Sequence, residues 1–78
     1  MKYEYSITRP DGTYYRSNHD YVSSDCTWIR DEIDATFFDE SDLLYLINES
    51  ELYLPDYSRI HISLNRIYIG SITINDFR

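Results

Sequence analysis

The sequence contains few residues that interrupt secondary structure and few that could form disulfide cross-links. It has one cysteine, Cys26, with two glycines and two prolines in 78 residues. A single cysteine excludes an internal disulfide, which suits a reducing cytoplasm. No run approaches 18 apolar residues, and residues 1–4 lack the apolar core of a signal peptide. We therefore expect a single domain over residues 1–78 that acts in the cytoplasm and binds no membrane.

Residues typical of catalytic and metal sites are also scarce. Only His19 and His61 could act as general bases near neutral pH, and neither has a serine or cysteine at a recognisable motif spacing. Gly12 and Gly70 stand alone, so there is no glycine-rich phosphate loop. The sequence lacks the Cys/His clusters of zinc sites and the Asp-x-Asp-x-Asp-Gly pattern of calcium loops. We expect no enzyme activity, no metal and no other cofactor.

The charge is strongly negative and unevenly distributed. Fourteen acidic residues face seven Lys and Arg, a net charge of −7 at pH 7. Eleven of the acids lie within residues 20–56, where Arg30 is the only Lys or Arg. This acidic block disfavours direct binding to nucleic acid or to an anionic membrane, because both need basic residues. It is either a solvated surface or a surface that a basic partner recognises.

The N-terminal residues predict a β-hairpin. Residues 2–8 alternate between apolar and polar side chains, which is the period of a strand, and residues 13–17 form the returning strand. Between them, Pro10 presets φ and Gly12 accepts a positive φ, as a turn requires.

The middle of the chain predicts helices at 24–37 and 40–48. The apolar residues of the first recur at helical spacing: Val22, Cys26, Ile29 and Ile33. On this stripe, Cys26 is expected to be a buried, inert thiol. Asp39 can cap the second helix through its carboxylate. No glycine or proline separates the two segments, so one kinked helix is the alternative.

A second hairpin is predicted near the C-terminus. Residues 59–64 alternate, Asn65 tolerates the left-handed φ of a tight turn, and residues 67–74 return. The returning segment has apolar side chains on both faces, Ile67 and Ile69 on one and Tyr68, Ile72 and Ile74 on the other. Such a strand is central in a sheet or partly covered by a partner.

These segments predict an α+β fold in two layers. The expected order is β-β-α(-α)-β-β, with an antiparallel sheet from two hairpins packed against one or two acidic helices. Residues 51–54 can add a short strand that ends before Pro55.

Nine tyrosines accompany the acidic block, and tyrosine is enriched where proteins contact proteins. We therefore expect a small acidic protein-binding module. It would inhibit a larger basic, nucleic-acid-binding protein by charge mimicry or steric occlusion. The expected partner-binding residues are six acids and two aromatic anchors: Asp31, Glu32, Asp34, Asp39, Glu40, Asp42, Trp28 and Tyr45.

In size, acidity and lack of catalytic motifs, the chain resembles small phage-encoded inhibitors of host defence, such as anti-CRISPR proteins and uracil-glycosylase inhibitors. That resemblance implies a viral protein that acts in the host cytoplasm. The alternative function is a structural or assembly subunit, which would form a homodimer or larger oligomer through the apolar strand at 67–74.

Overall fold

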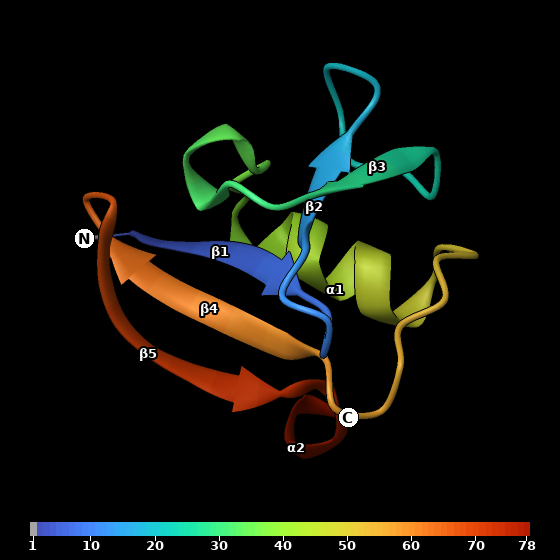
Figure 1. Cartoon of the computed structure of the whole chain (residues 1–78). Coiled ribbons are helices and arrows are strands. Elements are labelled where there is room, and N and C mark those ends of the chain that lie inside the picture. The colour runs from blue at the N-terminus through green and yellow to red at the C-terminus, as the bar shows by residue number, and fades with distance from the viewer. Residues whose placement is uncertain (1) are drawn as a thin grey trace.

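A five-stranded antiparallel sheet with strand order β3-β2-β1-β4-β5 forms the centre of the computed structural model, which describes residues 2–78 (Figure 1). The predicted α+β class and the antiparallel sheet are confirmed. The elements along the chain are β1 (Tyr3–Thr8), β2 (Tyr14–Ser17), β3 (Cys26–Ile29), the 3-10 turn η1 (Glu32–Asp34), α1 (Glu40–Asn48), β4 (Arg59–Leu64), β5 (Ile67–Thr73) and α2 (Ile74–Phe77).

The N-terminal hairpin forms as its sequence predicts. Strands β1 and β2 are joined by a turn in which the Gly12 N–H donates to the Arg9 carbonyl at 2.9 Å. Gly12 has a φ of 86°, a conformation that a residue with a Cβ rarely adopts. The carboxylate of Asp11 accepts hydrogen bonds from the backbone N–H and the hydroxyl of Thr13. The turn chemistry therefore fixes this hairpin locally.

The second hairpin, β4–β5, is also confirmed, but one detail differs from the prediction. Asn65 and Arg66 both have positive φ, as a two-residue hairpin turn requires. A β-bulge then shifts the register, because Ile62 pairs with Gly70 whereas Ser63 pairs with Tyr68. Strand β5 is an edge strand and not a central one, and it ends at Thr73, which caps α2.

The predicted helix at 24–37 is wrong. Residues Cys26–Ile29 form β3, which pairs along its whole length with β2, and only the short turn η1 follows. Ile33, placed on the buried helical stripe by its spacing, is 85% exposed. The spacing of four, three and four arose by chance, whereas Thr27, Trp28 and Ile29 are residue types that favour strands. Tertiary pairing with β2 therefore overrides the helical pattern.

The predicted short strand at 51–54 is also wrong, because no strand lies beside this segment within residues 2–78. Leu54 is buried and Leu52 packs against the core, while Tyr53 is exposed. Residues 51–54 instead form a loop without strand pairing.

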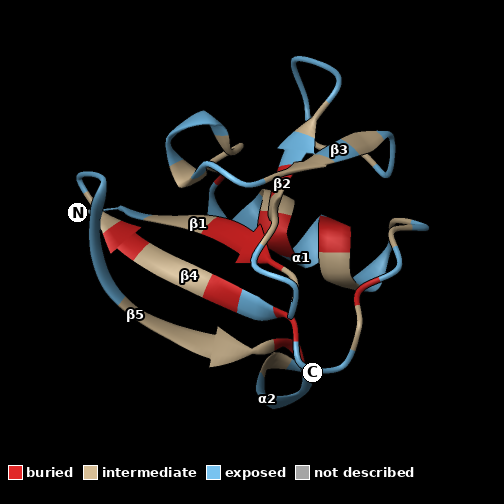
Figure 2. Ribbon diagram, viewed as in Figure 1, coloured by how far each residue is buried: buried red, intermediate tan, exposed pale blue. Residues whose placement is uncertain are grey.

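One face of the sheet forms the apolar core with α1 (Figure 2). The predicted helix at 40–48 is confirmed, and the Asp42 N–H donates to the carboxylate of its N-cap residue Asp39 at 2.9 Å. The core consists of eight buried side chains from the sheet, α1, α2 and the connecting loops: Ile7, Tyr15, Phe38, Leu43, Leu46, Leu54, Ile60 and Ile74.

The other face of the sheet, the second face, is polar. Side chains alternate along a strand, so residues paired with each other share a face, and Ser6 with His61 lie opposite the core pair Ile7 and Ile60. Ser6 and Ser63 are buried on this face. The His61 ring makes edge contacts with Tyr14 and Tyr68. The turn η1 therefore meets a polar surface and not a second apolar core.

Candidate functional site

The acidic residues are not gathered on one continuous face. Segment 31–40 runs through η1 to the start of α1, whereas Glu49, Glu51 and Asp56 follow the other end of that helix. Figure 1 shows these two stretches on opposite sides of α1. Asp25 lies in a third place, before β3, where it pairs with His19 at 2.7 Å. The fold thus divides the acidic block into separate clusters.

Three shallow hollows adjoin one another around the start of β1. The first, of about 300 Å³, lies between β1 and the start of α1. It shares Lys2, Tyr3 and Asp39 with a second hollow of about 230 Å³. That hollow shares Phe37 with a third, of about 190 Å³, beside η1. We call this surface the belt and define it by six of its lining residues: Tyr3, Tyr5, Glu32, Phe37, Asp39 and Glu40.

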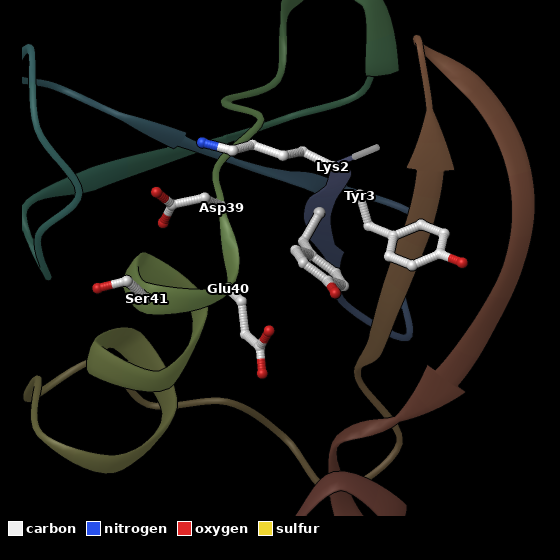
Figure 3. A pocket seen from close by; sticks show the side chains of 6 residues that line it. Lys2, Tyr3, Asp39, Glu40 and Ser41 are labelled. Atoms are coloured by element: carbon white, nitrogen blue, oxygen red, sulfur yellow. The ribbon is translucent and has the colours of Figure 1, made fainter.

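The first hollow combines carboxylates with tyrosine rings (Figure 3). Asp39 and Glu40 come from the start of α1, and Tyr3 and Lys2 come from the start of β1. Both carboxylate residues are exposed, and neither forms an ion pair with another of residues 2–78. Burial, and then the negative charge of Glu40, raises the pKa of Tyr5. Asp39 uses one carboxylate oxygen to cap α1, so its other oxygen and the carboxylate of Glu40 can meet a cation from outside the chain.

At the other end of the belt, hydrogen bonds and ring contacts hold η1 against the sheet. Glu32 Oε2 lies 2.9 Å from His61 Nδ1, on the second face. The guanidinium of Arg66 lies over the Phe37 ring, 4.1 Å from its centroid, and Nε of Arg66 donates to Glu4 at 2.8 Å. One carboxylate oxygen of Glu32 is thus already hydrogen-bonded within the domain.

The remaining predicted site residues lie outside the hollows. Asp31 and Asp34 are exposed on and beside η1, and Asp42 is half-buried in the first turn of α1. Tyr45 is partly exposed on α1. Trp28 is half-buried, packs edge-on against Tyr15 and lies beneath the guanidinium of Arg9. The belt therefore brings together Glu32, Asp39 and Glu40, but not the other five.

Sequence reasoning missed the belt residues that come from β1 and from Phe37. Tyr3 and Tyr5 alternate with Glu4, and a strand model assigns both tyrosines to the core face. Tyr3 is nevertheless 52% exposed, because it lies at the end of β1 beyond the reach of α1. The only signal in the sequence was the unusual number of tyrosines, which does not say which of them face outward.

The histidine and cysteine candidates are hydrogen-bonded or partly buried in the described chain. No group of three His, Cys, Asp or Glu side chains within residues 2–78 could hold a metal ion. Glu32, His61 and Ser6 are of the residue types of a catalytic triad, but Ser6 is fully buried and its hydroxyl has no hydrogen-bond partner in the described chain. Cys26 is half-buried on β3, and burial raises the pKa of its thiol, which disfavours the reactive thiolate.

In comparisons with protein-family models, curated proteins and solved structures, nothing matches this chain. None of the helices in residues 2–78 has the length and apolar character needed to cross a bilayer. Function is therefore inferred from the geometry and charge of the belt.

Proposed function

We propose that this chain is a small acidic protein-binding module that inhibits a larger protein by occupying its basic, nucleic-acid-binding surface. One observation carries the proposal: Asp39 and Glu40 are exposed, unpaired within residues 2–78, and adjacent to the rings of Tyr3 and Tyr5 in a hollow of about 300 Å³. Unpaired carboxylates beside aromatic rings suit the arginine and lysine side chains of a basic surface.

The charge distribution supports the proposal in a second way. With a net charge of −7, the domain attracts a basic partner over distances comparable to the Debye length, about 8 Å at physiological salt. Such steering accelerates association, while contacts made by rigid tyrosine rings slow dissociation. The carboxylates take the place of phosphates, so nucleic acid and this domain would compete for the same surface.

The proposed mode of action needs no catalysis, cofactor or metal from this chain. It requires a partner whose nucleic-acid-binding surface is accessible in the cytoplasm, as for inhibitors encoded by phages. The domain measures 29 × 27 × 24 Å, so once bound it also blocks nucleic acid sterically.

The test compares two variants that lose the same three negative charges. The belt variant carries Glu32→Gln, Asp39→Asn and Glu40→Gln; asparagine is also a good N-cap, so α1 is preserved. The control variant carries Asp20→Asn, Glu51→Gln and Asp56→Asn, three exposed acids outside the belt. Each immobilised variant, and the original chain, captures proteins from host lysate at low and high salt, and mass spectrometry identifies them.

The proposal expects a nucleic-acid-binding protein that is retained by the original chain and the control variant, released by salt, and lost from the belt variant. Added duplex DNA or RNA should displace that protein in proportion to its concentration. Equal capture by the belt and control variants would show that overall charge, and not the belt, is responsible. Capture that nucleic acid cannot displace would refute the competitive mechanism.

A further inference from the structure

The outer edge of β5 is exposed and carries no charge. Strand β5 pairs with β4 alone among the described residues, and its sequence, IYIGSIT, contains no charged residue and no proline. Ile67, Tyr68 and Ile69 are 68%, 54% and 53% exposed. Soluble proteins usually protect such edges with charges, prolines or short strands, because unpaired backbone groups bind further strands. Here the bulge at Ile69 is the only such feature.

We propose that β5 pairs antiparallel with β5 of a second copy of this chain, around a two-fold axis at Ser71. This inference is independent of the proposed inhibitory function. The bulge confines the regular part of the strand to Gly70–Thr73, and a pairing centred on Ser71 aligns Gly70–Ile72 of the two copies within that part. The two five-stranded sheets would become continuous through an isologous interface.

The side chains support this register. Gly70 would lie opposite Ile72 of the second copy, on the core side of both sheets. A Cβ added at Gly70 would meet nothing within 4 Å, and the φ of Gly70 is not left-handed, so nothing within the described chain requires glycine here. Glycine inside a strand often marks a place where another backbone or side chain approaches closely. The open space at Gly70 can accept the Ile72 side chain.

The charges near β5 disfavour a basic partner strand. The guanidinium of Arg66, which precedes β5, lies over Phe37 and donates to Glu4 of β1, so it stays with its own chain. A strand from a basic partner would approach the guanidinium of Arg59, which donates to Ser71 Oγ of β5, and repulsion between like charges disfavours that strand.

The distribution of the acidic block also favours a second copy at this edge. Strand order places β3, which Asp25 and Asp31 flank, at the opposite edge of the sheet from β5 (Figure 1). Two copies joined through β5 therefore keep these acids apart. The repulsion between two molecules of charge −7 is lowest when their uncharged edges meet.

The first test is the oligomeric state of the full chain, measured by sedimentation and light scattering across a concentration series. The original chain should form a dimer, and Ile69→Lys should abolish it. Ile33→Lys is the matched control, since it makes the same charge change at an exposed isoleucine outside β5 and should leave the dimer intact. Both substitutions reduce the net negative charge, so general repulsion cannot explain a selective loss.

The second test locates the axis. The Ser71→Cys substitution is made in a Cys26→Ser background, so that each chain has a single thiol. In the proposed dimer the thiols introduced at position 71 of the two copies face each other, and mild oxidation should link them covalently. Thr27→Cys, an exposed position on the other edge strand β3, should remain monomeric in the same conditions. A monomer at every concentration, a dimer that survives Ile69→Lys, or equal cross-linking at both positions would overturn the proposal.

Discussion

The two faces of the sheet are covered in different ways. On the core face, Leu43 and Leu46 of α1 pack against Ile7 and Ile60. The second face buries hydroxyl groups and the ring of His61, and a hydrogen bond to Glu32 joins it to η1. Helix α1 covers the core face through apolar packing, which has no preferred direction. The turn η1 covers the second face through a hydrogen bond, which does.

The two faces therefore contribute differently: one to the stability of the domain, the other to the position of η1. Burial of apolar side chains stabilises a fold by roughly 1.5–3 kcal/mol for each large residue, whereas a partly exposed ion pair contributes about 0–1 kcal/mol. The core face therefore holds the domain together, and the second face determines where η1 and its acids lie.

Leu46→Ala should lower the free energy of unfolding by about 2–5 kcal/mol, because Leu46 is fully buried under the core face and the substitution leaves a cavity. In the same helix, Leu44 is 42% exposed, and Leu44→Ala makes the identical chemical change. Urea unfolding should show a loss for Leu44→Ala of less than about 1 kcal/mol. Similar losses for both variants would mean that α1 does not seal this face as described.

Tyr15→Phe should cost about 1–3 kcal/mol, although its ring remains in the core. The Tyr15 hydroxyl donates to the Ser23 carbonyl at 2.7 Å and accepts from the Ser23 N–H at 2.9 Å, which ties the loop before β3 to β2. Tyr53→Phe, at an exposed tyrosine, is the control. Thermal unfolding measures stability, and amide hydrogen exchange should accelerate more in residues 22–25 than in α1.

Glu32→Ala should reduce stability by less than about 1 kcal/mol, because the bond to His61 is partly exposed. The main effect of Glu32→Ala should be on how firmly η1 is held against the sheet. Amide exchange should accelerate at Asp34 and Ala35, whose N–H groups donate to carbonyls of residues 31 and 32. Asp31→Ala, whose side chain does not cap η1, serves as the control. Unchanged exchange in the Glu32 variant would mean that η1 is held by other contacts.

The smallest effect is expected at Asp11, in a turn outside both covers. Hydrogen bonds from the Thr13 hydroxyl and N–H, and then from Arg9, lower the pKa of Asp11 from 3.8 to about 2. A lowered pKa stabilises the fold above pH 3.8, and this contribution disappears as the pH falls towards 2. The difference in melting temperature between the original chain and Asp11→Asn should therefore shrink over this range. NMR titration of the Asp11 carboxyl checks the pKa directly.

Local signals predicted much of the fold. Alternation and turn residues were sufficient for both hairpins, and the Asp39 cap with its apolar stripe was sufficient for α1. They failed between residues 20 and 37, where the helical spacing was accidental and the strand-forming residues were few. A four-residue strand such as β3 gives too short a pattern to compete with a longer false one.

The candidate site was less predictable than the fold. Asp39 and Glu40 could be chosen because they belong to the acidic block and lie at the start of a helix that Asp39 caps. Whether Tyr3 or Tyr5 lies beside them depends on how far α1 extends along β1, and no pattern in either segment contains that information. Trp28 was chosen for its size alone, and the fold packs it against Tyr15.

The two hairpins, helix α1 and the negative charge can be read from the sequence alone, because each follows from the composition or periodicity of contiguous residues. Tertiary structure alone decided that residues 26–29 form a strand, since their backbone groups pair with the free edge of β2. It also decided that the acidic block is divided, because η1 bonds to the second face while α1 packs on the other. Those outcomes depend on contacts between segments distant in sequence, which local preferences do not encode.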